Sequence, residues 1–293
     1  MNEPRLKIGI LGCGRVCEHY IDKILIPERV GNLFQVVACC DIDKNKSNYV
    51  AKIFSCKSYN NLEEFVKNKD IEVVLILTKS GQHYQHAKIC LSNDLNVIVE
   101  KPLSLRIEHA EELINISSEK QKFCASIFQN RLNPAVEITK QAYNRQRFGD
   151  LVSISVRLRW CRLQDYYNDG WHGTWAQDGG VTNQQAIHHV DALTWICGKV
   201  KSVCAIAAKR ANQLQAEDTL VAAIELENGA LATLELTTAA RPKDIEASIT
   251  ITGTDGAVKI GGVALNKIEQ WNFADNTDNE KEVTSQFSEE VEN

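Results

Sequence analysis

The residues with the clearest chemical meaning form the triplet Glu100-Lys101-Pro102, at the end of an apolar segment. A lysine at the end of a strand, facing a cofactor, can stabilise a developing alkoxide or move its proton. The alternative is a surface lysine paired with Glu100. Pro102 favours extended backbone at Lys101 and so fixes the direction in which the lysine leaves the strand. The triplet predicts acid–base chemistry on a hydroxyl, with Lys101 as a candidate catalytic residue.

A second candidate group lies in the segment 178–191, where His188 and His189 precede Asp191. The pKa of an unperturbed histidine is close to neutral, which suits a general base. His188 and His189 are rivals for this role, because neighbouring helix positions point about 100° apart. The alternatives are a histidine packed in the core or capped by Asp191, and a zinc site. Helical geometry turns the two rings away from each other, so no metal is expected.

The run Ile8–Cys17 predicts the cofactor, because an apolar strand leads into Gly12-x-Gly14 and then into a helix. Glycines let the backbone approach a pyrophosphate, and the helix N-terminus offers free N–H groups. Cys17 stands where Gly or Ala is usual, but its small side chain is compatible with close packing. Asp41 follows the second strand, 27 residues after Gly14. A carboxylate there favours NAD over NADP because it binds a ribose 2′-OH and repels a 2′-phosphate; the alternative is that Asp41 only starts a turn.

The first half of the chain alternates strand and helix patterns, which predicts a parallel sheet covered by helices. Ligands of such sheets lie beyond the carboxyl ends of the strands, where the polar residues stand here. The predicted strands are 6–11, 34–40, 72–77, 96–99 and 122–127, and the predicted helices are 15–26, 47–54, 62–67, 82–91 and 107–119.

The second half alternates apolar and polar residues in short strands, with hairpin turns at Asn228-Gly229 and Asp255-Gly256. The predicted strands are 151–160, 203–208, 219–226, 230–236, 247–252 and 257–260. The fold class is therefore an α/β Rossmann domain followed by an α+β domain with an open, mostly antiparallel sheet. The expected domains are 1–127, which binds NAD, and 128–274, the expected substrate domain, whose sheet faces can cover the first domain or another subunit; 275–293 is expected to be a loose acidic tail.

Composition excludes several classes of function. The chain has 293 residues, a net charge of −5 and no basic patch, so nucleic acid is not an expected partner. No apolar run approaches the roughly 20 residues that span a bilayer. Residues 1–5 lead straight into a strand, so no signal peptide is expected, and the ten scattered cysteines are interpreted as reduced thiols of a cytoplasmic protein. The pair Cys13 and Cys17 has no partnering Cys-His pair, which again predicts no metal.

Together, the glycine turn, the segment Thr78–His83 (T-K-S-G-Q-H) and the triplet 100–102 resemble the Gfo/Idh/MocA oxidoreductases. The resemblance covers nearly the whole chain. It implies a Rossmann domain with NAD or NADP and oxidation or reduction of a secondary alcohol or ketone on sugars, cyclitols and sugar nucleotides. The family's lysine falls on Lys101, and its histidine beside the nicotinamide falls on His188. The resemblance also implies a homo-oligomer, a dimer or tetramer built through the open sheet.

Two further segments, Phe128–Pro134 and Arg159–Trp175, resemble family members that act on UDP-linked N-acetylhexosaminuronic acids, the UDP-N-acetylglucosaminuronate 3-dehydrogenases. This implies oxidation of the sugar 3-hydroxyl to a ketone, ahead of a transaminase, for lipopolysaccharide or related surface glycans. The family commonly has an acidic residue four positions before the histidine, where this chain has Gln184 beside Asn183. An amide takes no proton, so proton transfer rests on His188 and Lys101. A dehydrogenase of a free sugar or cyclitol and a non-catalytic NAD-binding protein remain the alternatives.

Aromatic residues beside Arg159, Arg162 and Asn168 favour a wall that stacks a ring and holds an anion, rather than a set of core aromatics. The predicted NAD contacts are Gly12, Gly14, Arg15, Val16, Asp41, Thr78, Ser80, His83, Glu100, Lys101, Gln129 and Asn130. The predicted contacts to a sugar-nucleotide substrate are Arg131, Arg162, Tyr166, Tyr167, Trp171, Trp175, Asn183, Gln184 and His189.

Overall fold

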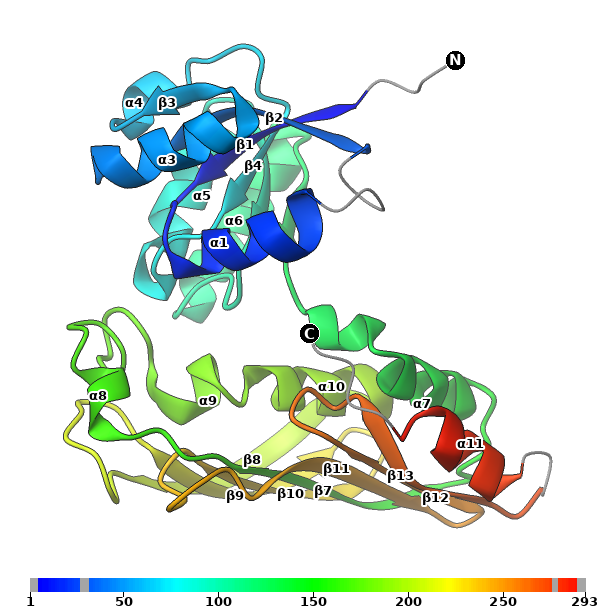
Figure 1. The fold of residues 1–293 in the computed structure, drawn as a ribbon. Coiled ribbons are helices and arrows are strands. Elements are labelled where there is room, and N and C mark those ends of the chain that lie inside the picture. The colour runs from blue at the N-terminus through cyan, green and yellow to red at the C-terminus, as the bar shows by residue number, and fades with distance from the viewer. Residues whose placement is uncertain (1–4, 27–31, 276–278, 289–293) are drawn as a thin grey trace. The chain divides into compact units, whose positions relative to one another are not determined.

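The computed structural model describes residues 5–26, 32–275 and 279–288. The chain divides into two compact units, residues 1–127 (unit 1) and 128–293 (unit 2), drawn in Figure 1. Within the described ranges, no helix is long and apolar enough to cross a membrane.

Unit 1 contains a six-stranded parallel sheet of order β3-β2-β1-β4-β5-β6, as the sequence predicted for a dinucleotide-binding domain. The sequence pattern did not predict β3, a three-residue edge strand. The strands are β1 (Leu6–Leu11), β2 (Phe34–Cys40), β3 (Lys57–Tyr59), β4 (Val73–Ile76), β5 (Asn96–Val99) and β6 (Cys124–Ser126).

Helices cover both faces of this sheet, with α1 and α3 in one apolar cluster and α4, α5 and α6 in the other. Asp43 caps α3 by accepting from the Asn45 N–H, so this helix starts three residues earlier than predicted. The helical elements are α1 (Arg15–Tyr20), the π-helical turn η1 (Ile21–Leu25), α3 (Lys44–Phe54), α4 (Leu62–Phe65), η2 (Ser80–Gln82), α5 (His83–Ser92) and α6 (Ile107–Lys120).

Unit 2 contains a seven-stranded sheet of order β13-β12-β11-β7-β10-β9-β8. Among the described strand pairs of this sheet, only β7–β10 is parallel, so the predicted mostly antiparallel sheet is confirmed. The strands are β7 (Leu151–Arg159), β8 (Val200–Ala208), β9 (Thr219–Leu226), β10 (Leu231–Thr237), β11 (Glu246–Gly253), β12 (Gly256–Gly261) and β13 (Lys267–Phe273), of which β13 was not predicted.

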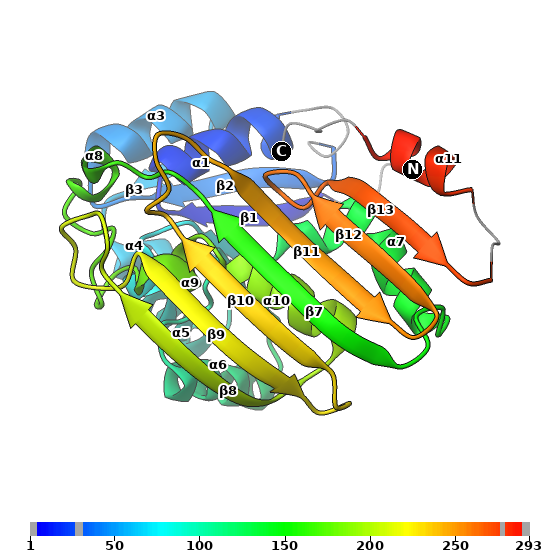
Figure 2. The same ribbon diagram turned by 90° about the horizontal axis from the view of Figure 1, so that it is seen from below.

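The helices of unit 2 pack on one face of its sheet, and Figure 2 shows the strands of the other face. That other face exposes apolar side chains, among them Ile206, Val221 and Leu231. The helical elements are η3 (Gln129–Leu132), α7 (Pro134–Asn144), α8 (Gln164–Tyr167), α9 (Gly180–Gln184), α10 (Ile187–Cys197) and α11 (Glu280–Gln286).

The described part of the C-terminal segment differs from the loose tail that its composition predicted. Asp275 accepts two hydrogen bonds of 2.8 Å from Arg147. Asn279 caps α11, and acidic residues in its first turn interact favourably with the helix dipole. Val283 is buried in the core of unit 2. Phe287 also packs against this core, and its carbonyl accepts from the Ile268 N–H at 3.2 Å. These contacts fix the described part of the segment, and the rest of the predicted tail lies outside the described residues.

Candidate active site

The turn after β1 has the geometry of a dinucleotide-binding turn. Gly12 has a φ of +97°, and a Cβ there would lie 2.8 Å from the backbone of Leu77, so only glycine fits. Gly14 precedes α1 without a side-chain cap, and a Cβ on it would meet no atom within 4 Å. The first N–H groups of α1, at Arg15 and Val16, are therefore accessible to an anion. Cys17, which stands where Gly or Ala is usual, is fully buried on the inner face of α1.

Asp41 lies at the carboxyl end of β2 with a fixed carboxylate. Its Oδ2 accepts from the Cys13 N–H at 2.7 Å, and its Oδ1 accepts from the Asp43 N–H at 2.8 Å. Asp41 thus organises a turn and also ties that turn to the glycine loop. A carboxylate oxygen accepts more than one hydrogen bond, so both oxygens retain capacity for a ribose hydroxyl. These residues fit NAD.

His83 and Glu100, both predicted NAD contacts, have internal partners. The buried His83 ring has Nδ1 2.7 Å from the carbonyl oxygen of Pro102 and Nε2 2.9 Å from that of Thr78. Burial lowers the pKa of His83. Glu100 accepts from the Tyr20 hydroxyl at 2.7 Å and from the Lys101 N–H at 2.9 Å. Both side chains therefore bind neighbouring loops of unit 1, and the NAD contacts predicted for them stay predictions.

Two neighbouring loop residues have different surroundings. The Thr78 Oγ1 lies 3.0 Å from Nδ1 of His86, and Ser80 is buried at the start of η2. Burial lowers the pKa of His86 to about 4. Gln129 and Asn130, the last two predicted NAD contacts, belong to η3 of unit 2, where Gln129 is exposed and Asn130 is buried.

The two candidate histidines of α10 have different environments. His188 is half-buried, with its ring edge-to-face on Phe128 at 6.2 Å between centroids. His189 is only 1% exposed and packs edge-to-face on Trp160. Neither ring nitrogen of His189 has a hydrogen-bond partner among the described residues, and burial lowers its pKa to about 4. His189 is thus buried within unit 2, and the substrate contact predicted for it stays a prediction. In the described ranges, no three His, Cys, Asp or Glu side chains are grouped so as to hold a metal ion.

Arg131, a predicted substrate contact, is bound inside unit 2. Its Nε donates to Oδ2 of Asp191 at 2.8 Å, and its Nη2 donates to Oδ1 at 2.5 Å. The guanidinium also lies over the rings of Trp195 and Phe128, 4.3 and 5.4 Å from their centroids. A fork-to-fork pair uses the edge of the guanidinium that would bind a substrate anion. Arg131 therefore contacts both Phe128 and Asp191. Phe128 in turn contacts His188, which lies on α10 together with Asp191.

We expect Arg131→Ala to lower kcat by roughly tenfold to a hundredfold, because small displacements of a reacting group are costly. In this variant Asp191 loses its ion-pair partner, and α10 loses its side-chain contact with η3. We expect the free energy of unfolding to fall by about 3 kcal/mol. Arg147→Ala is the matched control, since Arg147 makes the same fork with Asp275 and also lies over an aromatic ring. Steady-state kinetics and melting temperature separate the two effects. An equal loss of kcat in both variants would contradict a positioning role for Arg131.

Three of the four predicted wall aromatics belong to one aromatic cluster, because the His172 ring contacts both Tyr166 and Trp171, with centroids 4.3 and 3.7 Å apart. Tyr167 is buried, and its hydroxyl lies 2.8 Å from Oγ1 of Thr238. Tyr166 packs on Tyr167, and its hydroxyl accepts from Nε2 of Gln185 at 3.2 Å. Burial raises the pKa of Tyr166 to about 12, so the hydroxyl stays protonated. Tyr167 is thus buried in unit 2, and its predicted substrate contact stays a prediction.

The other two aromatics lie further along the same segment. Trp171 stacks on His172 with centroids 3.7 Å apart, and Trp175 is 60% exposed. His172 in turn has Nδ1 2.5 Å from Oδ2 of Asp169. A stacking surface for a ring is therefore available at the two tryptophans and at Tyr166.

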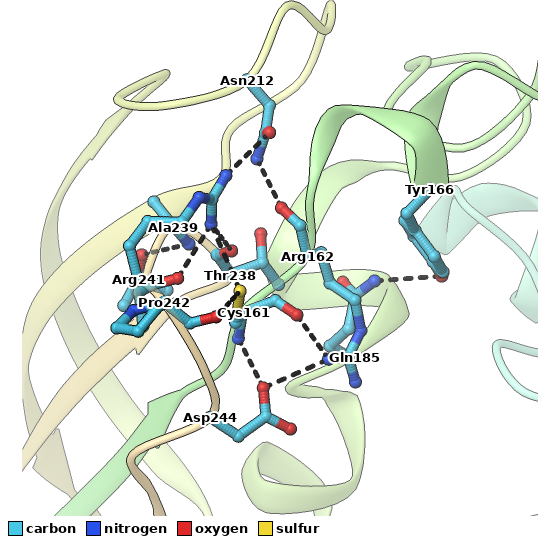
Figure 3. Close-up of polar contacts among 12 residues, drawn as sticks. Cys161, Arg162, Tyr166, Gln185, Asn212, Thr238, Ala239, Arg241, Pro242 and Asp244 are labelled. Atoms are coloured by element: carbon cyan, nitrogen blue, oxygen red, sulfur yellow. Dashed lines mark hydrogen bonds and ion pairs between the residues drawn. The ribbon is translucent and has the colours of Figure 1, made fainter.

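Arg162 is the centre of a polar network that the sequence pattern did not predict, drawn in Figure 3. Its Nη1 donates to the Cys161 carbonyl at 2.9 Å and to Asp244 at 3.3 Å. The Arg162 carbonyl accepts from Asn212, whose Oδ1 accepts from Arg241 at 3.0 Å. Asp244 and Asn212 stand 82 and 50 positions away from Arg162 in the sequence, so no local pattern could identify them.

Helix α9, which carries Asn183 and Gln184, is held by Glu217. The Glu217 Oε1 accepts from the backbone N–H of Thr182 at 3.2 Å and from its hydroxyl at 2.9 Å. The amide of Asn183 donates to the Gly179 carbonyl at 3.4 Å. A carboxylate at this helix start interacts favourably with the helix dipole. Glu217 was not predicted, although it determines where both amides lie.

Comparison with known proteins gives the family. The profile of the oxidoreductase family with the NAD-binding Rossmann fold matches residues 6–128, and that of the Gfo/Idh/MocA C-terminal domain matches residues 136–259. Among curated proteins, an uncharacterised oxidoreductase of Synechocystis is 27% identical over 251 residues, covering 81% of this chain and 67% of that protein. The trans-1,2-dihydrobenzene-1,2-diol dehydrogenase of Sus scrofa is 22% identical over 255 residues, covering 87% and 74%.

Two solved structures are similar over nearly the whole chain. The WlbA dehydrogenase of Chromobacterium violaceum, in complex with NADH and UDP-GlcNAcA, is 31% identical with a TM-score of 0.92, covering 98% of this chain and 83% of that one. The WlbA dehydrogenase of Bordetella pertussis, in complex with the same two ligands, is 30% identical with a TM-score of 0.91, covering 98% and 84%. The chain belongs to the Gfo/Idh/MocA family and is an NAD-dependent oxidoreductase.

Proposed function

We propose that the protein oxidises the 3-hydroxyl of a UDP-linked N-acetylated sugar uronic acid to a ketone, with NAD as the hydride acceptor. The similarity to two dehydrogenases that bind NADH and UDP-GlcNAcA, over 98% of this chain, carries the proposal. The amides of α9, where other members have a carboxylate, are consistent with it. The product would serve the synthesis of amino sugars for surface polysaccharides such as lipopolysaccharide, in the cytoplasm.

In the proposed mechanism, Lys101 and His188 both act on the sugar hydroxyl. Lys101 stabilises the negative charge that develops on the hydroxyl oxygen, and His188 takes the proton. NAD, when bound, accepts the hydride from the same carbon. Asn183 and Gln184 orient the sugar by hydrogen bonds, since an amide takes no proton.

In the proposed cofactor site, Gly12, Gly14, Arg15 and Val16 hold the pyrophosphate and Asp41 binds the ribose. The fixed carboxylate of Asp41 supports NAD over NADP, because a 2′-phosphate would meet a like charge. Thr78, Ser80 and Lys101 stand at neighbouring strand ends of the same sheet edge, which supports contacts nearer the nicotinamide.

The test is NADH formation with UDP-GlcNAcA, glucose or inositol as the substrate and NAD or NADP as the cofactor. We expect turnover with the UDP-sugar and NAD. Turnover with glucose or inositol alone would replace the proposal by a free-sugar or cyclitol dehydrogenase. NAD binding with no reduction by any sugar would indicate a non-catalytic NAD-binding protein.

We also propose that the chain forms a homo-oligomer through the free face of the unit 2 sheet. Ile206 is 78% exposed there, and Val221 and Leu231 are more than half exposed. Cross-strand neighbours on this face, such as Ser155 and Thr233, are small, which suits the packing of one sheet on another. Sedimentation velocity would report the number of subunits, and a monomer at assay concentration would contradict the proposal.

A further inference from the structure

The carboxyl group of Glu100 joins a helix of unit 1 to the main chain of Lys101. Glu100 directly follows β5, and its own N–H donates to the Ile76 carbonyl of β4 at 3.0 Å. Its Oε1 accepts from the Tyr20 hydroxyl at 2.7 Å, and its Oε2 accepts from the Lys101 N–H at 2.9 Å. Side chains that are held by such hydrogen bonds keep a neighbouring functional residue in one geometry. The backbone at Lys101 is therefore fixed through Glu100.

Tyr20 has the properties of a permanent donor to this carboxyl group. It is the last residue of α1, is only 8% exposed, and packs in an apolar cluster with Cys17 and Ile21. Burial raises the pKa of Tyr20, and the neighbouring Glu100 raises it further. The hydroxyl thus keeps its proton at any pH at which a dehydrogenase is assayed, and the packed ring holds it in place.

The helix changes its winding directly after Tyr20. The α-helical part, α1, ends there, and the π-helical turn η1 follows, with the Ile26 N–H donating to the Ile21 carbonyl at 3.1 Å. Turns of this kind are uncommon inside helices and are often found at functional sites. The position of η1 therefore singles out Tyr20 among the buried residues of α1.

Helix α1 connects the proposed cofactor loop to the strand end that carries Lys101. Gly14 of the glycine turn is its N-cap residue, and Tyr20 is at its other end. The helix has six residues, so its two ends lie about 9 Å apart. One short helix thus contacts both the turn proposed to hold the pyrophosphate and, through Glu100, the main chain of the proposed catalytic lysine.

A separate contact fixes the chain just after Lys101. Nδ1 of the buried His83 ring lies 2.7 Å from the Pro102 carbonyl oxygen. This contact involves neither Tyr20 nor Glu100, so it persists in a variant that lacks the Tyr20 hydroxyl. Removing that hydroxyl should therefore alter the orientation of Lys101 without unfolding the loop around it.

We propose that Tyr20 is a positioning residue for the oxidation, because its hydroxyl holds Glu100 and Glu100 holds the main-chain N–H of Lys101. Tyr20 itself takes no part in proton or hydride transfer. Without its hydroxyl, the Glu100 carboxyl group rotates more freely, and the Lys101 amine spends less time at the sugar hydroxyl. The inference rests on the proposed function for the role of Lys101 and adds the residue that keeps the lysine in place.

The first test is the kinetics of Tyr20→Phe, which keeps the ring and removes the hydroxyl. We expect kcat with UDP-GlcNAcA and NAD to fall by about tenfold to a hundredfold, with KM and NADH affinity nearly unchanged, because only a reacting group is misplaced. Tyr84→Phe is the matched control, since the Tyr84 hydroxyl also donates to a carboxylate, Glu112, in the same unit. An equal kcat in Tyr20→Phe and Tyr84→Phe would overturn the inference and leave the proposed function standing.

A double-mutant cycle tests whether Tyr20 acts through Glu100. In Glu100→Gln the amide accepts on its oxygen but not on its nitrogen, so the side chain cannot hold both donors. The variant Tyr20→Phe/Glu100→Gln should then have a kcat no lower than that of Glu100→Gln alone, because the two residues act as one unit. Losses that multiply would show that Tyr20 acts by another route and would contradict the inference.

Hydrogen exchange tests the positioning without any substrate. Pro102 has no N–H, so site-resolved mass spectrometry of residues 100–102 reports only on the amides of Glu100 and Lys101. In enzyme saturated with NADH, Tyr20→Phe should speed exchange at the Lys101 amide about tenfold, and Tyr84→Phe should not. Unchanged exchange in Tyr20→Phe would refute the inference whatever the substrate. If exchange rises but wild type oxidises no UDP-sugar, the positioning stands and the proposed function fails.

Discussion

Replacing Lys101 by alanine is expected to lower kcat by about 10²- to 10⁴-fold, the usual contribution of a positioned acid–base group. NAD affinity should stay nearly unchanged, because Gly12, Gly14 and Asp41 hold the dinucleotide from other strand ends. The main-chain N–H of Lys101, which donates to Glu100, persists in the variant. Stopped-flow reduction of NAD and fluorescence titration with NADH measure the two quantities separately.

Lys79 provides the matched control, since it is an exposed lysine just beyond the carboxyl end of β4 in the same sheet. Lys79→Ala should retain near wild-type turnover. Lys101→Arg keeps the charge but cannot give up a proton, because the pKa of arginine is too high. Retained turnover in Lys101→Ala would exclude the catalytic role, and partial recovery in Lys101→Arg is expected because that role is to stabilise charge.

Local patterns predicted the Rossmann sheet well because its strands are buried on both faces and therefore apolar throughout. Two other strands were not predicted because they lack such an apolar run. β3 is a three-residue edge strand whose side chains are partly or fully exposed, and β13 alternates only weakly around Trp271. Helix α11 was missed because charge dominates its composition, whereas Val283 and the adjacent Phe287 pack into and against the core. Long-range contacts decide such elements.

The candidate site was predictable where chemistry depends on residue type next to a strand end, as at Gly12 and Asp41. It was not predictable where a side chain's partner lies far away in the sequence. Asp191 lies 60 positions from Arg131 and binds its guanidinium. Tyr167 reaches Thr238 across 71 positions. Both residues have the type expected of a ligand contact, and only the folded partner shows that they support the structure.

The adjacent histidines allow the proposed base to be tested within one helix. His188→Asn should lower kcat by about 10²-fold or more, because asparagine accepts a hydrogen bond but takes no proton. The rise of kcat with pH that a neutral histidine base produces should also disappear. His189→Leu should leave kcat close to that of wild type, since His189 is buried and makes no hydrogen bond within the described residues. Full steady-state pH profiles of both variants provide the comparison.

The pH dependence of stability is expected to identify His189 as the core histidine. Burial holds the pKa of His189 at about 4, below its ordinary value near 6.5, so the unfolded chain binds a proton that the folded chain refuses. Its contribution to stability is complete above about pH 6.5 and declines toward pH 4, by about 1.4 kcal/mol per unit. His189→Leu should flatten this decline in melting temperature, and His188→Asn should not. If His188→Asn flattened it and His189→Leu abolished turnover, the roles of the two histidines would have to be exchanged.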